Sequence, residues 1–262
     1  MTHHAPTLDG LNPDALRGHL SGLTVKQDAS LAALTTHLTE HPGAVRWSGG
    51  KDSTVALHLA LQVNPNVAVC FFDSGLEFPE NRIYMQHLTD VWNVNLHIIK
   101  ATPDALSIMA ASGGWNHELN APTPPLTISL HDALIVNPSR QATADHGAGE
   151  INGMRTQESA GRRALLASGR GYYRRADGTQ VLAPLRNWTD DHVNGYLARH
   201  GVPENPVYTK LRALGASGKD LRVGLAFDGN CLEYGRVTWL RRGWPDLYAS
   251  VERALPRVRE WR

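Results

Sequence analysis

Apolar residues fall into two alternating kinds of segment in the first hundred positions. Residues 67–72 (VAVCFF) form a continuous apolar run, a pattern typical of a strand that is buried on both faces, and residues 44–47 and 95–100 are also predicted to be strands. Residues 52–63 and 79–92 instead carry apolar side chains at helical spacing. Strands that alternate with helices in this order predict an α/β fold, with a doubly wound, mostly parallel sheet covered by helices on both faces.

The second half of the chain gives shorter signals. Residues 150–154 (EINGM) are predicted to form a fourth strand, and Asp177-Gly178 predicts the turn of a hairpin. Thr189, which precedes two aspartates, is predicted to cap a helix. Pro245 opens a last amphipathic helix, so a C-terminal helical region is expected to be appended to the sheet domain.

Composition excludes several classes of protein. The chain has 262 residues, 19% of them charged, and a net charge of +1, so no general basic field points to nucleic acid. Its two cysteines, Cys70 and Cys231, are too few for a disulfide framework or a four-thiolate metal site. No segment has the length and apolarity of a membrane span, and the first residues lack the pattern of a signal peptide. These features predict a cytoplasmic protein without a membrane partner.

The strongest functional signal is the sequence AVRWSGGKDS, in which an apolar strand turns through small, polar residues into a helix. Such a turn presents backbone N–H groups at a helix N-terminus, where the helix dipole favours an anion. Ser48 and Ser53 add hydroxyl donors, and Lys51 adds a positive charge. Gly49 and Gly50 allow phosphate oxygens to approach the main chain. The sequence therefore predicts a phosphate-binding loop.

This loop does not fit the common motif G-x-x-x-x-G-K-[ST], because Asp52 follows the lysine and the first glycine of the motif is missing. Two interpretations of Asp52 stay open. It is either a carboxylate that the helix dipole favours or a ligand of Mg²⁺.

The hexapeptide SGGKDS resembles the pyrophosphate loop (PP-loop) of the ATP pyrophosphatases, which cleave ATP between the α- and β-phosphates and usually adenylylate a substrate. Three further segments are similar to the phosphoadenosine-phosphosulfate (PAPS) reductase branch of that superfamily. They are FDSGLEFPE at 72–80, GMRTQESAGR at 153–162 and the stretch 182–208, which ends in NPVY. Together the four matches cover roughly residues 40–210 in family order.

The resemblance implies an adenine nucleotide alpha hydrolase-like (Rossmann-like) fold that binds ATP at the C-terminal ends of its parallel strands. It implies catalytic roles for Lys51, Asp52 and Arg155, with Asp52 as the candidate Mg²⁺ ligand. The nucleotide-binding residues that it implies are Ser48, Gly49, Gly50, Lys51, Asp52, Ser53, Asp73, Ser74, Gly75, Gly153, Arg155, Glu158 and Arg162. Glu77 is left open between a site and a surface position, and Trp188 and Tyr208 are predicted to be packing residues.

The sequence departs from the reductases in its cysteines. Sulfonucleotide reductases attack sulfur with the thiolate of a Glu-Cys-Gly motif, and this chain has no such motif. Cys70 lies inside an apolar strand, so it is expected to be buried and unreactive. Cys231 lies in the sequence DGNCLEYG, which differs from the Glu-Cys-Gly motif of the reductases.

The hypothesis that follows is an enzyme that cleaves ATP to AMP and pyrophosphate and adenylylates a substrate, with Mg²⁺ and without a covalent side-chain nucleophile. The acceptor is unidentified, and it is either a small molecule or a nucleic acid. Three alternatives stay open: a reductase of PAPS or adenylylsulfate, an adenylyltransferase similar to the flavin-adenine-dinucleotide (FAD) synthases, and a non-catalytic nucleotide-binding subunit. A homo-oligomer or a complex with a partner subunit is compatible with each of them.

Three regions are expected along the chain. Residues 1–28 are interpreted as a peripheral N-terminal arm, 29–210 as the PP-loop nucleotide-binding domain, and 211–262 as a divergent C-terminal extension packed on it. Trp239 and Leu240 are predicted to point inward and Arg241 and Arg242 outward, as in an amphipathic cap. The competing interpretation is that these aromatic and basic side chains bind nucleic acid.

Overall fold

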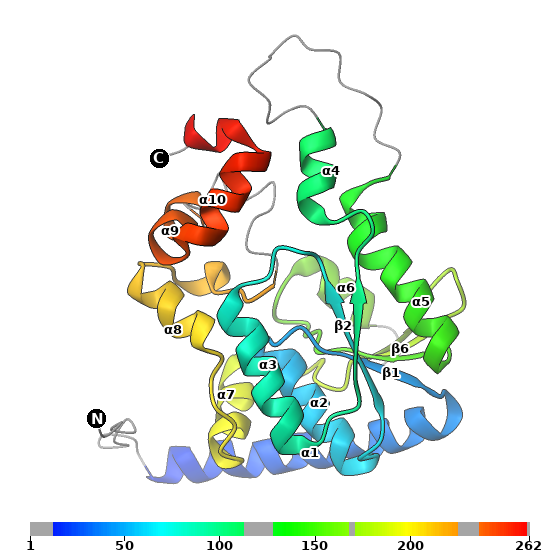
Figure 1. The fold of residues 1–262 in the computed structure, drawn as a ribbon. Helices are drawn as coiled ribbons and strands as arrows, with labels where there is room; N and C mark the ends of the chain where they lie inside the picture. Colours follow the sequence, from blue (N-terminus) through cyan, green and yellow to red (C-terminus); the bar gives the residue numbers. More distant parts are fainter. Residues whose placement is uncertain (1–12, 113–127, 168–170, 225–235, 261–262) are drawn as a thin grey trace.

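A computed structural model describes residues 13–112, 128–167, 171–224 and 236–260 (Figure 1). Its centre is a six-stranded sheet of order β3-β2-β1-β4-β6-β5. All neighbouring strands are parallel except β5 and β6, which form an antiparallel pair. The strands are β1 (Gly43–Arg46), β2 (Ala68–Asp73), β3 (Leu96–Lys100), β4 (Gly149–Ile151), β5 (Tyr172–Arg174) and β6 (Gln180–Leu182).

The predicted α/β fold with a mostly parallel sheet is thus confirmed, and so is the hairpin around Asp177-Gly178. The fourth strand is shorter than the predicted 150–154, because β4 ends at Ile151 and the chain leaves the sheet there. The residues that follow Ile151 enter the loop region at the C-terminal edge of the sheet.

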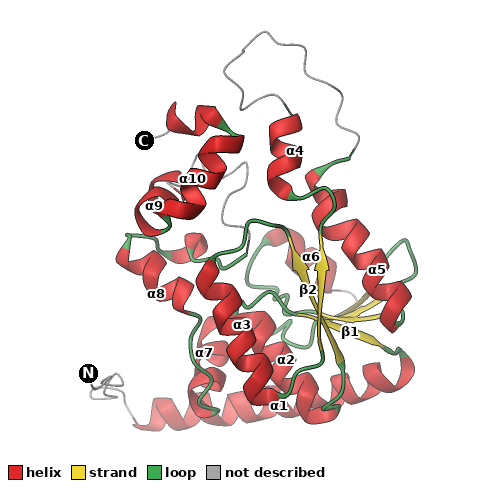
Figure 2. Cartoon of the chain, in the orientation of Figure 1, coloured by secondary structure: helices red, strands yellow, loops and turns green. Residues whose placement is uncertain are grey.

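Helices cover both faces of the sheet, with the strands between them (Figure 2). One face carries α1 (Pro13–Glu40), α2 (Lys51–Val63), α3 (Pro79–Trp92) and α7 (Asp190–Arg199). The main hydrophobic core lies there, and Trp47, Val55, Leu59, Leu88 and Ile151 are among its buried residues. The other face carries α5 (Asn137–His146), which follows a π-helical turn at Asp132–Val136. Shorter helices are α4 (Ala105–Ala111) and α6 (Ala160–Ala167).

The N-terminal region differs from its prediction. The 28-residue helix α1 begins at Pro13 and so includes residues 13–28 of the predicted peripheral arm. Leu23, placed in the predicted peripheral arm, is 2% exposed and belongs to the main core. Residues 1–28 are predicted to be peripheral because their apolar residues show no clean periodicity, whereas α1 as a whole contacts α2 and α7.

The C-terminal helices build a second hydrophobic cluster beside the sheet domain. It unites α4 with α8 (Pro206–Ala213), α9 (Arg236–Gly243) and α10 (Pro245–Ala254). Leu240 is 1% exposed whereas Arg241 and Arg242 are exposed, as predicted for an amphipathic cap. Glu80 of α3 accepts hydrogen bonds from Lys210 Nζ (2.6 Å) and Trp244 Nε1 (2.6 Å), which ties the cluster to the sheet domain.

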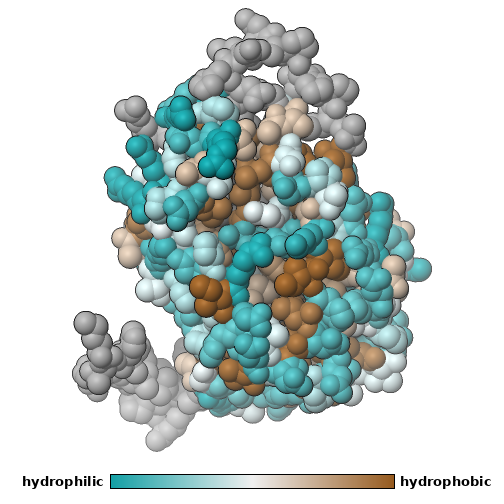
Figure 3. All heavy atoms as spheres, viewed as in Figure 1, coloured by the Kyte–Doolittle hydropathy of each residue, from teal (hydrophilic) through white to brown (hydrophobic). Residues whose placement is uncertain are grey.

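Polar side chains cover most of the face that carries α3, with apolar ones exposed near its middle (Figure 3). Ile83 of α3 and Ile98 of the edge strand β3 are exposed at 69% and 54%. Within the described ranges, no helix combines the length and the apolar character needed to cross a bilayer.

His37 of α1 makes the stability of the core dependent on pH. It is 1% exposed, and burial, assisted by nearby His41, lowers its pKa to about 4. Because its pKa in the unfolded chain is near 6.5, the unfolded state binds more protons between pH 4 and 6.5. The free energy of unfolding should therefore fall by about 3 kcal/mol as the pH drops through this window.

His37→Gln is expected to flatten this pH dependence, which denaturant unfolding at pH 4 to 7 would measure. The matched control is His87→Gln, a substitution at an exposed position of α3. Equal pH slopes for the two variants would contradict the assignment.

Candidate active site

A cavity of about 700 Å³ lies at the C-terminal edge of the sheet. The Ser48–Ser53 loop, the end of β2, the segment after β4 and the π-helical turn surround it. Its lining includes Ser48, Gly50, Asp52, Ser53, Ser74, Glu77, Gly153, Glu158 and Arg162, and its more apolar part is formed by Phe71, Phe72, Leu130, Leu134 and Met154. Most residues predicted from the sequence are thus brought together around one cavity.

Two buried asparagines, Asn81 and Asn205, bind the loop from the protein interior. Gly49 adopts φ +77°, and a Cβ at this position would lie 2.0 Å from Oδ1 of Asn81. Asn81 Nδ2 donates to the carbonyl of Ser48 (3.1 Å), and Asn205 Nδ2 donates to the carbonyl of Gly49 (3.0 Å). Because these two carbonyls point toward the buried asparagines, the amides of the loop are directed away from the protein interior. The sequence analysis missed both asparagines.

The loop amides are largely available to a ligand. Within the described chain, no acceptor lies in reach of the amides of Gly49, Asp52 and Ser53. The amide of Lys51 donates to the hydroxyl of Tyr208 (3.2 Å), whose own proton has no acceptor among the described residues. Burial raises the pKa of Tyr208 to about 12, so the hydroxyl stays neutral and able to donate. Tyr208 is therefore a packing residue, as predicted, that also reaches the loop.

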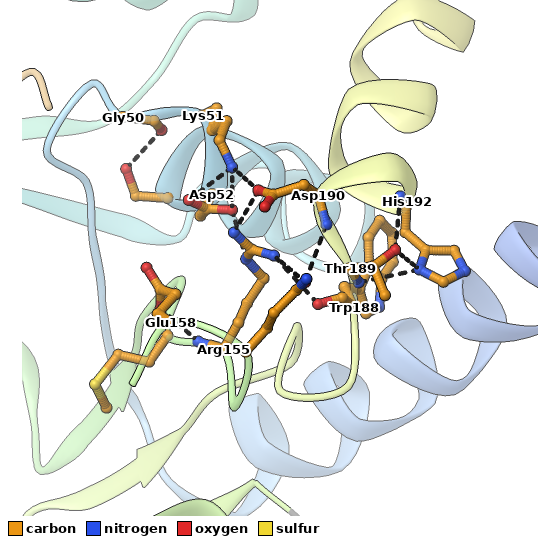
Figure 4. Close-up of polar contacts among 12 residues, drawn as sticks. Gly50, Lys51, Asp52, Arg155, Glu158, Trp188, Thr189, Asp190 and His192 are labelled. Atoms are coloured by element: carbon orange, nitrogen blue, oxygen red, sulfur yellow. Dashed lines mark hydrogen bonds and ion pairs between the residues drawn. The ribbon is translucent and has the colours of Figure 1, made fainter. Parts of the chain in front are cut away.

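Four charged side chains form a compact cluster beside the loop (Figure 4). Lys51 Nζ lies 2.5 Å from Oδ1 of Asp190, and Arg155 Nη2 lies 2.8 Å from the same oxygen. Arg155 Nε lies 2.7 Å from Oδ1 of Asp52. Two cations and two carboxylates thus neutralise one another, and Lys51 and Arg155 point to Asp190 and do not line the cavity.

The carboxylates of this cluster differ in environment. Burial raises the pKa of Asp52, with Lys51 and Arg155 opposing the shift. The hydrogen bond from Lys51 lowers the pKa of Asp190, which is 55% exposed at its side chain. Thr189 caps α7 as predicted, by accepting from the amide of His192, and so fixes the neighbouring Asp190 at the first turn of the helix.

The segment after β4 packs against the loop. Gly153 approaches the first turn of α2 so closely that a Cβ would lie 2.6 Å from the amide nitrogen of Ser53. Glu158 accepts from the amide of Arg155 (2.8 Å) and pairs with Arg162. Glu158 and Arg162 therefore stand at the cavity as one ion pair.

Some residues at the end of β2 form a turn, and others line the cavity. Asp73 Oδ1 accepts from the amide of Gly75 (2.9 Å) and pairs with Arg82 (2.7 Å), so it stabilises the turn, and neither Asp73 nor Gly75 lines the cavity. Ser74 does line it. Glu77 also lines the cavity and is 7% exposed, so it is not the surface residue of the other interpretation.

Cys70 lies on the floor of the cavity but is 1% exposed. Burial raises the pKa of its thiol to about 11, so it stays protonated at neutral pH, as predicted for an unreactive cysteine. Beside it, Arg46 stacks on the ring of Phe72 at 4.3 Å and pairs with buried Glu150. Cys231, the other cysteine, lies outside the described residues.

Asp52 is the one predicted metal ligand. In the part of the chain that the structure describes, no group of three or more histidine, cysteine, aspartate or glutamate side chains is arranged around a common point for a metal. Asp52 nevertheless lines the cavity at the foot of the loop. A single carboxylate of this kind suits Mg²⁺ when phosphate oxygens supply further ligands.

Comparisons with known proteins show which family this sequence resembles. The family model "Phosphoadenosine phosphosulfate reductase domain" matches residues 43–228. A phosphoadenosine 5'-phosphosulfate reductase from Xanthomonas campestris pv. campestris is 30% identical over 207 residues, 78% of this chain and 79% of that protein. The reductase of the same name from Sodalis glossinidius is 29% identical over 199 residues, 74% of this chain and 75% of the relative.

Two solved structures share the fold. The PAPS reductase from Candida auris, a phosphate complex, superposes with a TM-score of 0.51 at 18% identity, over 82% of this chain and 96% of that one. The FMN adenylyltransferase from Candida glabrata, in complex with FMN and the ATP analogue AMPCPP, gives a TM-score of 0.53 at 12% identity, over 78% of this chain and 62% of that one. The α/β fold is thus shared with both proteins, and the match of the family model over residues 43–228 shows that the chain belongs to the phosphoadenosine phosphosulfate reductase domain family of enzymes.

Proposed function

We propose that this protein binds Mg·ATP, transfers the adenylyl group to an oxygen nucleophile of an acceptor substrate and releases pyrophosphate. One observation carries the proposal: a loop with unpartnered amides at Gly49, Asp52 and Ser53 lies at a nucleotide-sized cavity. The described cysteine of that cavity, Cys70, is buried and protonated, which disfavours thiol chemistry there. The ATP analogue bound by the FMN adenylyltransferase of the same fold gives further support.

Catalysis in this proposal rests on positioning and charge. The acceptor oxygen attacks the α-phosphorus, and the bond to the bridging oxygen of the β-phosphate breaks as pyrophosphate leaves. The loop amides and the hydroxyl of Tyr208 are placed to stabilise charge on the departing phosphates. Asp52 would hold Mg²⁺, which neutralises phosphate charge when bound.

Lys51 has to change partner for this role. In the structure its ammonium group is bound to Asp190 at 2.5 Å. A polyphosphate on the loop carries several negative charges and competes with this single, half-exposed carboxylate. Lys51 would then turn from Asp190 to the phosphates, and Arg155 would keep both aspartates paired.

Lys51→Ala is expected to lower the formation of AMP and pyrophosphate from Mg·ATP about a hundredfold, because one of the charges that stabilise the leaving group is lost. Chromatographic separation of the nucleotide products, with a panel of candidate acceptors present, measures this. Lys100→Ala, at an exposed position of β3, serves as the matched control. Unchanged turnover in folded Lys51→Ala, or ADP and phosphate as products, would contradict the proposal.

Reduction of a sulfonucleotide is a second candidate, favoured by the names of the relatives at about 30% identity. It requires a reactive thiol, and the thiol of Cys70 is unsuited to that role. The reductase alternative therefore depends on Cys231. It predicts thioredoxin-dependent sulfite formation from PAPS or adenylylsulfate that disappears in Cys231→Ser.

Further parts of the proposal concern the surroundings of the site. We take 29–210 as the nucleotide-binding unit and 211–262 as an extension that shapes the acceptor side of the cavity. The acceptor is a small molecule or a nucleic acid, and the protein acts in the cytoplasm. A sulfur or nitrogen group that later displaces AMP from the acceptor would be supplied by a second copy of the chain or by a partner subunit. A stable adenylylated product would instead favour the FAD-synthase-like alternative.

A further inference from the structure

Glu77 is a buried acid that no contact described so far explains. It follows β2 between Leu76 and Phe78, which are 1% and 3% exposed and belong to the C-terminal hydrophobic cluster. Glu77 itself is 7% exposed and lines the cavity. Glutamate is rarely buried unless it is paired, because removing a carboxyl group from water is unfavourable.

The two oxygens of this carboxyl group have different surroundings. Oε1 accepts hydrogen bonds from the hydroxyl of Ser74 (2.7 Å) and from its amide (3.4 Å). Oε2 is buried and has no donor among the residues that the structure describes. The nearby cation Arg82 is engaged by Asp73. Burial raises the pKa of Glu77, and the charge of Asp73 adds to this shift, while the bonds from Ser74 and the charge of Arg82 oppose it.

The position of Glu77 relates it to a nucleotide. β1 and β2 are adjacent parallel strands, so the loop after β1 and the turn after β2 lie at the same edge of the sheet, where both line the cavity. Phosphates held by the loop would leave the sugar and the base to extend into the rest of the cavity, toward Phe72, Leu130 and Leu134. The first hydrogen-bond donors beyond the phosphates are the ribose hydroxyls and the exocyclic amine of adenine.

We infer that Glu77 determines nucleotide specificity, with its Oε2 accepting a hydrogen bond from the nucleoside part of the ligand. This inference rests on the proposed binding of ATP. A ligand that supplies the missing donor removes an unfavourable unpaired acceptor. An analogue without that donor leaves the acceptor unpaired, which is the strongest basis for discrimination in a buried site.

The test is the affinity of the wild type and of Glu77→Gln for ATP, 2'-deoxyATP, 3'-deoxyATP and inosine triphosphate, measured by calorimetry with Mg²⁺. Glutamine keeps the shape of the side chain and the bond from Ser74, but it places an NH₂ donor where Oε2 was. We expect ATP to bind about ten- to a hundredfold more weakly to Glu77→Gln. We also expect the wild type to reject one analogue by a similar factor, and the variant to lose that discrimination.

The analogues distinguish the two sources of the donor. Rejection of a deoxynucleotide assigns the bond to the ribose hydroxyl that this analogue lacks, and rejection of inosine triphosphate assigns it to the base amine. Glu204→Gln is the matched control, since Glu204 is exposed, pairs with Arg212 and is not part of the cavity lining. Thermal unfolding separates specificity from structure, because Glu77→Gln should melt at no lower temperature than the wild type.

Three results would overturn the inference, and they differ in what they say about the proposed function. If the wild type binds ATP but treats all four nucleotides alike, or if Glu77→Gln leaves the profile unchanged, the role of Glu77 is wrong and nucleotide binding stands. If the folded wild type binds none of the four nucleotides, the proposed function falls together with the inference.

Discussion

Replacing Arg155 by methionine is expected to lower the free energy of unfolding by about 3–5 kcal/mol, as is typical when one partner of a buried ion pair is removed. The side chain of Arg155 is 3% exposed and contacts both Asp52 and Asp190. Without it, the one cation that remains near Asp52 among the described residues is Lys51, at 3.4 Å. The protein is also expected to lose most of its affinity for ATP, since Lys51 would then be needed by the two carboxylates. Urea unfolding and ATP titration measure the two effects.

A double-mutant cycle separates charge from packing. Asp52→Asn in the Arg155→Met background removes the buried unpaired carboxylate and should restore part of the lost stability. Arg163→Met is the matched control, because Arg163 is exposed on α6 and its replacement should change the free energy of unfolding by less than about 0.5 kcal/mol. Equal stability losses for Arg155→Met and Arg163→Met would contradict the importance of the cluster.

Gly153→Ala is expected to weaken ATP binding about a hundredfold or more with a smaller effect on stability. The added Cβ would lie 2.6–2.8 Å from backbone atoms of Asp52 and Ser53, so the first turn of α2 has to move. Displacements of about 1 Å in a binding site reduce activity by about this factor. Overpacking of one methyl group reduces stability by about 1–3 kcal/mol.

Gly161→Ala provides the control for this substitution. The nearest atom to its Cβ would be the hydroxyl oxygen of Ser159 at 4.0 Å, and the residue lies within α6, where alanine is favoured over glycine. Calorimetric titration of both variants with ATP checks the expectation. Normal affinity in Gly153→Ala would show that the loop does not depend on this close approach.

Much of the sheet domain could be predicted from the sequence because its signals are local. The helix 79–92 was predicted with its observed ends, since Pro79 fits the first helical turn and Asn93 adopts the left-handed conformation that ends the helix. The phosphate-binding loop was predicted because its small and polar residues are contiguous. The start of α1 could not be predicted in this way because the residues before Leu31 show no clean apolar periodicity.

The partners of the loop could not be predicted in this way. Asn205 and Tyr208 lie 156 and 157 residues from the groups that they bind in the loop, and Asp190 lies 139 residues from Lys51. An asparagine in a turn or a tyrosine after proline has the same local appearance whether or not it reaches a distant amide. The sequence context of Arg155 likewise does not show the two aspartates that contact it in the fold.

The contacts of Asn205 and Tyr208 with the loop have a consequence for synthesis on the ribosome. All six strands of the sheet are encoded before residue 205, so the sheet can assemble on the nascent chain while the loop still lacks the groups that bind its Gly49 carbonyl and its Lys51 amide. The site becomes complete only after the segment around Asn205 and Tyr208 has left the exit tunnel. The loop therefore acquires its fixed conformation later than the sheet that carries it can assemble.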